Sequence, residues 1–245
     1  MYHNSIFLNS IEFIDSSWDG FLDEDLINLL LSIEKKVIQT HKEHTPSNNK
    51  VLRFMERSLY DTRVIILGQD PYPQKDVATG RAFEVGTLRS WNEKFSNISL
   101  KNIIRAIYSA YNNQYLKYSE IKKLRPEDFM ISAPNELFKR WEKQGVLLLN
   151  TSFTCEIGKS NSHEKYWSNF TNRLLKYITK VNQLIIIWFL WGNNAKSIVS
   201  DVPIDKKIES MHPMMCYQKP DRTDDFLFGR INCFNETKNI INWLG

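Results

Sequence analysis

Nearly continuous apolar runs alternate along the chain with segments whose apolar positions recur every three to four residues. Three such runs, RVIILG, GVLLLN and QLIIIWFLWG, cover residues 63–68, 145–150 and 183–192. A weaker fourth candidate, KKIESMHP, covers 206–213. Continuous rather than alternating apolarity is typical of parallel strands that are covered on both faces. We therefore predict that these segments are strands of one parallel sheet.

Helical spacing marks the longer segments at 20–42, 99–114 and 162–181. Strands that alternate with helices indicate a layered α/β domain with right-handed crossovers. In such a sheet the reacting groups gather at the carboxyl ends of the strands. The residues at those ends are Gln69–Tyr72, Asn150, Gly192–Asn193 and His212. The sequence thus predicts that four loops, distant along the chain, converge on one crevice.

The polar groups at this predicted crevice favour cleavage of a glycosidic bond. No serine or cysteine stands next to a plausible base, which argues against acyl transfer. GQDPYP at 68–73 matches neither glycine-rich phosphate-binding pattern. No second histidine stands at ligand spacing from His212, so we expect no metal and no other cofactor. What remains is a carboxylate for a cationic sugar, a donor for the leaving group, an amide for a base edge and two aromatic rings for stacking. These groups are Asp70, His212, Asn150, Tyr72 and Phe83.

Composition bounds the class of protein. The 245 residues, 42% of them hydrophobic, suffice for a sizeable core and show no internal repeat or linker, so we expect a single domain over 1–245. The net charge of +4 permits nucleic acid as a partner without requiring it. Three cysteines without paired spacing favour a reducing compartment. The N-terminus lacks signal-peptide features, and the apolar run at 184–192 is too short to span a bilayer. We expect a cytoplasmic monomer without membrane association.

Several short motifs follow one another in an order that one family shares. After GQDPYP come ATGRAFEV, NISLKN at 97–102, GVLLLN, the NSH triplet at 161–163, LWG at 190–192, HP at 212–213 and the closing stretch FGRINCFNETKNIINW. In this order the motifs resemble those of the family 1 uracil-DNA glycosylases, and agreement of several motifs is far more specific than any one of them. The resemblance assigns 51–245 to the family-matching core and leaves 1–50 as a helical N-terminal region.

The resemblance implies a fold, an activity and partners. The fold would be a three-layer α/β/α arrangement around a central, mainly parallel, four-stranded twisted sheet. The activity would be hydrolysis of the N-glycosidic bond of a uracil flipped out of DNA, as in base excision repair, leaving an abasic site with no lyase step. The partner would be uracil-containing DNA, and a proteinaceous inhibitor that mimics DNA is a second candidate partner.

The same resemblance assigns roles to residues. Asp70 would stabilise the sugar cation and position water, while His212 would face an oxygen of the leaving base. The backbone amide of Gln69 would support uracil, and Tyr72 would crowd its C5 position. Phe83 would stack on the base and Asn150 would bind its edge. DNA contacts would come from Ser99, Gly192, Asn193, Pro213, Met214, Met215, Cys216 and Tyr217.

Three departures from the family pattern stand out. Pro73 replaces a histidine, although poxvirus members also carry proline there. SWNEKFSNISL at 90–100 replaces a run of prolines. The family's HPSPLS reads HPMMCYQKPDRTDDF at 212–226, so Cys216 takes the position of a leucine that enters the duplex. Substitute wedges are then Met214, Met215 and Tyr217.

The altered loop bears on substrate preference. Charges cancel between 212 and 245, which indicates a weak grip on a second strand. We therefore expect a preference for single-stranded over paired uracil. The alternative is a catalytically weak or inactive relative that serves as a DNA-binding or protein-binding module. A glycosidase for another pyrimidine fits less well, because Tyr72 and Asn150 both match uracil. We also expect His163 to hold a loop.

Scattered basic residues are candidate phosphate contacts, although such residues are usually solvated surface. They are Lys75, Arg81, Lys101, Lys196, Lys219 and Arg222.

Overall fold

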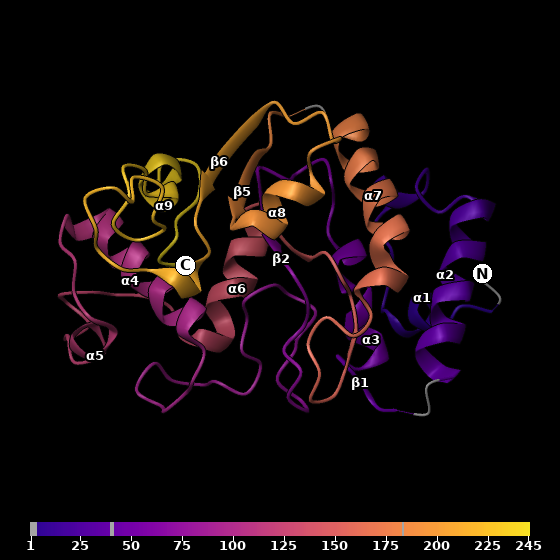
Figure 1. The fold of residues 1–245 in the computed structure, drawn as a ribbon, viewed down its shortest axis with the longest axis horizontal. Helices are drawn as coiled ribbons and strands as arrows, with labels where there is room; N and C mark the ends of the chain where they lie inside the picture. The colour runs from indigo at the N-terminus through magenta and orange to yellow at the C-terminus, as the bar shows by residue number, and fades with distance from the viewer. Residues whose placement is uncertain (1–3, 40–41, 183) are drawn as a thin grey trace.

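The computed structural model of the protein describes residues 4–39, 42–182 and 184–245. A four-stranded sheet with the order β3-β2-β5-β6 crosses its centre (Figure 1). Its strands are β2 (Val64–Gly68), β3 (Val146–Asn150), β5 (Ile187–Trp191) and β6 (Lys206–Ser210). Every pairing in the sheet is parallel. The four predicted strands are therefore confirmed. The last two are shorter than predicted, and residue 183 of the predicted third strand lies outside the described residues.

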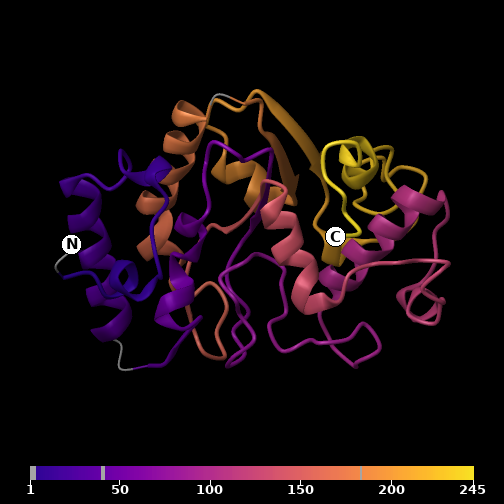
Figure 2. The same cartoon turned by 180° about the vertical axis from the view of Figure 1, so that it is seen from behind.

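Helices cover both faces of the sheet, as Figure 2 shows from behind. Successive residues of a strand point to opposite faces, so β2 contributes to two separate hydrophobic clusters. Ile65 and Leu67 pack in one cluster with α2 (Glu24–Gln39) and α7 (Glu164–Val181). Val64 and Ile66 pack in the other with α4 (Ile98–Asn112), α6 (Pro134–Lys143) and α9 (Cys233–Thr237). The expected three-layer α/β/α arrangement is confirmed.

The predicted helices correspond to α2, α4 and α7, whereas α6 was not predicted. It starts with Pro134 at its first turn, where proline is preorganised, and buries Leu137, Phe138 and Trp141 on one side. Its ten residues follow the highly charged segment KKLRPEDFMISA at 122–133, and the helix is too short for its periodicity to stand out. Residues 40 and 41 of the first predicted helix lie outside the described residues.

The remaining elements are short. They are α1 (Ile6–Ser10), η1 (Ser16–Trp18), β1 (His44–Thr45), α3 (Asn48–Val51), η2 (Arg53–Glu56), α5 (Tyr118–Ile121), β4 (Cys155–Glu156), α8 (Asn193–Ile198) and η3 (Pro213–Met215). β1 and β4 form a separate two-stranded antiparallel sheet. No helix in the described part of the chain is long and apolar enough to cross a membrane.

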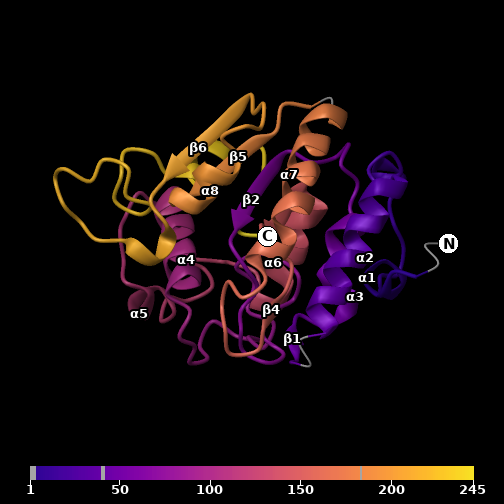
Figure 3. The same cartoon turned by 45° about the vertical axis from the view of Figure 1, so that its right-hand side comes forward.

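The N-terminal helices pack on the outer side of α7, as Figure 3 shows. The buried Glu34 of α2 accepts hydrogen bonds from the Ser5 hydroxyl (2.6 Å) and from the N–H groups of Ile6 and Phe7 (3.0 Å each). A buried carboxylate is tolerated when its oxygens are hydrogen-bonded, so Glu34 fixes α1 to α2.

Candidate active site

A cavity of about 210 Å³ lies at the carboxyl ends of the strands. Seven of the predicted site residues line it: Gln69, Asp70, Tyr72, Phe83, Ser99, Asn150 and His212. The convergence predicted from strand order is therefore present for the loops after β2, β3 and β6. Gly192 and Asn193, which follow β5, do not line the cavity. An added Cβ at Gly192 would approach the Cβ of His212 to 3.0 Å, so this glycine lets the two loops pack closely.

Asp70 is held in place by a loop far away in sequence. Its Oδ2 accepts a hydrogen bond from the N–H of Asn161 at 2.8 Å. Burial raises the pKa of Asp70 above its ordinary value; the Asn161 hydrogen bond opposes this, and the charge of Glu164 adds to it. Asp70 is thus an oriented, partly desolvated carboxylate, as charge stabilisation in a pocket requires.

The ring of His212 presents one defined nitrogen to the cavity side. The N–H of Met214 donates to Nδ1 of His212 at 3.2 Å, which makes Nδ1 an acceptor. Burial lowers the pKa of His212 below its ordinary value. The neutral ring therefore carries its proton on Nε2, where it is a donor for a ligand.

Asn150 is buried at the end of β3, with 6% of its surface exposed. It lies opposite Gly68 in the parallel register. A Cβ on Gly68 would collide with the side-chain oxygen of Asn150 and with Ala82. Glycine at this position therefore makes room for the amide at the floor of the cavity.

Two aromatic residues form the walls. Phe83 has a positive φ of 65°, a conformation that costs energy for a residue with a side chain. Its ring centroid lies 5.2 Å from that of Trp191 and 6.1 Å from that of His212. The Tyr72 hydroxyl donates to the Phe83 carbonyl at 3.4 Å, and burial raises the pKa of Tyr72 to about 12. Tyr72 is therefore a neutral, immobilised wall.

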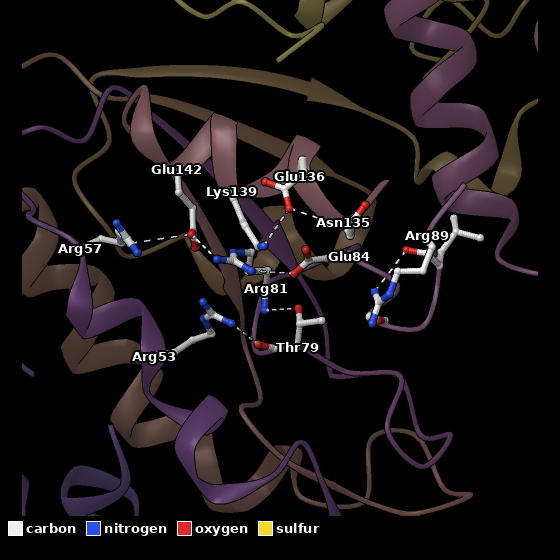
Figure 4. A network of polar contacts seen from close by, with 12 residues as sticks. Arg53, Arg57, Thr79, Arg81, Glu84, Arg89, Asn135, Glu136, Lys139 and Glu142 are labelled. Atoms are coloured by element: carbon white, nitrogen blue, oxygen red, sulfur yellow. Dashed lines mark hydrogen bonds and ion pairs between the residues drawn. The ribbon is translucent and has the colours of Figure 1, made fainter. Parts of the chain in front are cut away.

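A buried ion network lies beneath the segment that carries Phe83 (Figure 4). Arg81 donates to Glu84 at 2.9 Å and to Glu142 of α6 at 2.6 Å, and all three side chains are about 5% exposed. Burial alone would lower the pKa of Arg81, but the two carboxylates raise it above its ordinary value. Arg81 also lines the cavity. The interpretation of Arg81 as a phosphate contact or as solvated surface is wrong, because its charge is paired inside the protein.

Six lining residues of the cavity were not predicted as site residues: Gly68, Pro71, Pro73, Ala78, Arg81 and Ser160. Ser160 comes from the loop between β4 and α7, which also supplies the Asn161 amide for Asp70. Its position directly before the NSH triplet is the signal that points to it. In the same loop His163 is buried, and its Nδ1 lies 2.9 Å from the Thr154 hydroxyl, in agreement with the loop-holding role expected for it.

The loop after His212 is fixed from within. Asp225, fully buried, accepts hydrogen bonds from the N–H groups of Tyr217 (3.1 Å), Leu227 (2.9 Å) and Phe228 (3.0 Å). The guanidinium of Arg222 pairs with Asp225 at 2.9 Å and lies 3.6 Å from the Tyr217 ring centroid. We call residues 213–228 the braced loop. Arg222 serves this brace.

The braced loop displays apolar side chains. Met214 is 56% exposed and Met215 is 52% exposed. Cys216 is turned the other way: it packs against the second hydrophobic cluster, and its thiol donates to the Pro213 carbonyl at 3.1 Å. Pro213 itself is buried. The side chains that project from the loop are therefore the methionines and Tyr217, rather than Cys216 at the position of the family's leucine.

A larger hollow of about 560 Å³ lies at the opposite, amino-terminal ends of β2 and β3. Its lining includes Arg57, Asp61, Arg63 and Glu142 but none of the predicted site residues. Its size alone does not make it the site. Among the described residues, no three His, Cys, Asp or Glu side chains converge in a way that could hold a metal ion.

A family model described as the uracil DNA glycosylase superfamily matches residues 55–234. The chain belongs to this superfamily. The uracil-DNA glycosylase of Fusobacterium nucleatum is 29% identical over 240 residues, which cover 95% of this chain and 93% of the relative. That of Clostridium perfringens is 31% identical over 207 residues, or 81% of each chain.

Solved structures share the fold. UNG from Nitratifractor salsuginis has a TM-score of 0.66 at 24% identity, covering 85% of this chain and 87% of that one. Mimivirus uracil-DNA glycosylase has a TM-score of 0.65 at 21% identity, covering 91% of this chain and 82% of that one. A mimivirus UNG variant in complex with UGI has a TM-score of 0.63 at 23% identity, covering 83% and 71%. The superfamily match spans every element that lines the cavity.

Proposed function

We propose that this protein hydrolyses the N-glycosidic bond of uracil in DNA and leaves an abasic site, without a lyase step. The observation that carries the proposal is the convergence of Asp70, Asn150, Tyr72, Phe83 and His212 on one cavity in a member of the uracil DNA glycosylase superfamily. This activity would place the protein in base excision repair.

The cavity suits each step of base recognition. The face of Phe83 stacks on the flipped uracil, and the amide of Asn150 pairs with its edge through one donor and one acceptor. The backbone amide of Gln69 supports the base. Tyr72 lies between two prolines and is hydrogen-bonded to the Phe83 carbonyl, so it is a rigid wall against the methyl group of thymine.

Asp70 and His212 carry the chemistry. As the bond to the base breaks, the sugar becomes cationic and the departing base becomes anionic. Asp70, already oriented by the Asn161 N–H, stabilises the cation and orients the attacking water. The Nε2–H of the neutral His212 ring donates to the oxygen on which the negative charge develops. Neither group has to reorient during the reaction, which is the condition for efficient electrostatic catalysis.

DNA contacts extend the site beyond the cavity. Ser99 lies at its rim in the first turn of α4, Gly192 borders His212, and Asn193 follows Gly192 at the start of α8. Pro213, Cys216 and Tyr217 shape the braced loop, while Met214 and Met215 are its exposed wedge. Extrusion of a base is easier from a single strand than from a duplex. Since Arg222 is paired with Asp225 inside the loop, the loop offers little charge to a second strand, and we propose a preference for single-stranded uracil.

The same proposal covers the domain organisation, the location, the oligomeric state and a second partner of the protein. The shared cluster of N-terminal helices and α7 supports a single domain over 1–245. We propose a cytoplasmic monomer that needs no metal or other cofactor. A mimivirus relative has been solved in complex with UGI, which supports a proteinaceous inhibitor as a second partner of the same surface.

The test is release of uracil from single-stranded and duplex oligonucleotides, with thymine oligonucleotides and EDTA as controls. We expect uracil release from both substrates, faster from the single strand, with no effect of EDTA and no release of thymine. Intact uracil DNA at high protein concentration, together with retained DNA binding, would instead support the non-enzymatic binding module.

A further inference from the structure

The positive charge of the molecule is concentrated on one side of the candidate pocket. Residues 88–131, here called the basic segment, hold eight Lys and Arg and four Asp and Glu. The basic segment alone thus carries a net charge of +4, equal to that of the whole chain, and the rest of the chain is balanced. Such an asymmetry is the electrostatic footprint expected of a surface that binds nucleic acid.

Most of this charge is available to a ligand. The acidic side chains of the segment are engaged locally: Glu93 accepts from the Ser90 N–H at 2.8 Å and Glu120 from the Lys117 N–H at 2.7 Å, while Arg125 pairs with both Glu127 and Asp128 at 3.2 Å. Four exposed lysines of the segment form no ion pair with any described residue: Lys94, Lys117, Lys122 and Lys123.

The basic segment continues directly from the candidate pocket. Ser99 lines that pocket, and three residues before the start of α4 the ring of Phe95 lies 5.1 Å from the Lys101 ammonium. The Phe95 ring meets the ring of Tyr118 edge to face at 5.4 Å. Lys101 of α4, two residues after the pocket-lining Ser99, is thus connected through Phe95 to Tyr118.

Tyr118 lines a second cavity, of about 200 Å³, close in size to the 210 Å³ of the candidate pocket. Its walls are mainly apolar and aromatic: Trp91, Ile104, Tyr118, Leu124, Phe129 and Ile131. The donors of two of these rings are already used, since Trp91 donates to the Ser132 carbonyl (2.9 Å) and Tyr118 to the Trp91 carbonyl (2.8 Å). The lining of the cavity is therefore mainly apolar and aromatic, with Ser90, Asn92 and Lys122 as its polar side chains, and every nucleobase has a face that can stack on an aromatic ring.

We propose that this cavity binds a second nucleobase of the same DNA strand whose uracil occupies the candidate pocket, while the lysines of the basic segment contact the phosphates between the two bases. The inference rests on the proposed function for the identity of the strand. Lys122 is the one charged residue among those lining the cavity, and it is a cation. Charge complementarity therefore favours a polyanion, and the similar volumes of the two cavities, about 210 and 200 Å³, favour one base in each.

The experiment compares single-stranded oligonucleotides of increasing length. The shortest carries uracil with one nucleotide on each side, and two series extend it on the 5′ or the 3′ side only. We expect kcat/KM to rise about tenfold once one of the two extensions reaches the second cavity, the usual scale for stacking of one base. Replacing single extension nucleotides by abasic spacers should remove the gain at one position and so reveal the register.

Two variants remove the gain without touching the candidate pocket. Lys122→Glu reverses the charge at the cavity, and Met130→Glu places a carboxylate at its rim, where Met130 is 74% exposed and the change does not disturb the core. Both variants should abolish the rise of kcat/KM with oligonucleotide length. Their kcat/KM for the shortest oligonucleotide should stay within about twofold of the unsubstituted protein. Lys206→Glu on β6 makes the same charge change outside the basic segment and should retain the gain.

The outcomes separate this inference from the proposed function. Cleavage of the shortest oligonucleotide tests the proposed function alone. A kcat/KM that does not depend on length, or a length gain that survives both cavity variants, overturns the second base site. If no oligonucleotide is cut, anisotropy measurements of Kd on the same series answer the same question. Equal Kd values for all lengths would then reject the second site, and an acidic protein segment would become the alternative occupant.

Discussion

The basic segment and the braced loop both lie next to the candidate pocket, but they differ in how their charged side chains are paired. The basic segment pairs its acidic side chains locally and leaves four lysines exposed. The braced loop buries Asp225, pairs it with Arg222 and exposes Met214 and Met215. Composition already gives the two regions different net charges, +4 for the basic segment and −1 for the braced loop. What also differs is whether a cation has a partner inside the protein.

This difference suggests a division of labour around one pocket. In the division that we propose, the basic segment would contact the phosphates of the strand that carries uracil. The braced loop would meet the DNA with apolar side chains on a backbone that is already ordered. The two regions touch, since the side chain of Asn102 on α4 donates to the Pro213 carbonyl at 2.6 Å. Four variants test this division.

The largest effect is expected within the pocket itself, and it should be the same for every substrate. Asp70→Asn removes the charge that, in the proposed mechanism, stabilises the sugar cation, but it keeps the shape of the side chain. We expect kcat to fall by about 10²–10³, the usual scale for one lost electrostatic group, with Kd for DNA within about twofold. Single-turnover rates and anisotropy on single-stranded and duplex uracil DNA measure both quantities.

Asp76→Asn, in the same loop but exposed, is the matched control and should retain activity. A loss for Asp70→Asn that differs strongly between the two substrates would mean that Asp70 also takes part in strand separation.

The second largest effect should separate the two regions. Asp225→Asn removes the charge that orders the braced loop, and a lost hydrogen bond to a buried charged group costs about 1–3 kcal/mol. We expect kcat/KM on duplex DNA to fall by about tenfold, while kcat/KM on single-stranded DNA should change by less than about twofold. The exposed Asp221→Asn in the same loop serves as the control.

The brace should resist acid. Burial alone would raise the pKa of Asp225, but its hydrogen bonds lower the pKa below the ordinary value. Its contribution to stability is therefore present above the ordinary aspartate pKa and is lost only as pH falls through the lowered value. Equal loss on both substrates for Asp225→Asn would contradict the proposed division.

A smaller effect, on opposite substrates in the two regions, is expected when exposed methionines are replaced. Replacing both Met214 and Met215 by serine keeps the loop backbone but removes the apolar wedge. Because a wedge offsets part of the few kcal/mol needed to extrude a base from a duplex, we expect about a fivefold loss on duplex DNA only. Met130→Ser in the basic segment should show the reverse pattern, with a loss only on long single strands. Two variants with the same pattern would show that the regions do not act separately.

The smallest effect is a change in pH dependence that leaves both regions untouched. Glu164, in the first turn of α7, raises the pKa of Asp70 through its charge. Asp70 acts as a carboxylate, so activity is full above its pKa and falls as pH drops through it. Glu164→Gln should therefore lower this pKa and move the acid limb of kcat/KM to lower pH, equally for both substrates.

Glu127→Gln makes the same change in the basic segment and should leave the acid limb in place. A shift of the limb to higher pH for Glu164→Gln would contradict the electrostatic account of Asp70.

The sequence by itself determined the sheet and most of the pocket. Apolar runs of five or six residues are decided by neighbours along the chain, so β2 and β3 were predicted within one residue. Because parallel strands end at the same edge of the sheet, Asp70, Asn150 and His212 could be assigned to one crevice before any coordinates. Motif order then identified the superfamily.

Only the tertiary structure decided which polar groups meet. Arg81 pairs with Glu142, 61 residues away, and Asp70 is oriented by Asn161, 91 residues away; neither contact has a local signature. The same holds for the second cavity, whose walls combine α4, α5 and the loops on either side of them between 90 and 131. Hydrophobic patterning is local and repeats every few residues, whereas the pairing of charges depends on which distant segments pack together. The sequence therefore gives the net charge of the basic segment and of the braced loop, whereas only the folded chain shows which of those charges have partners inside the protein.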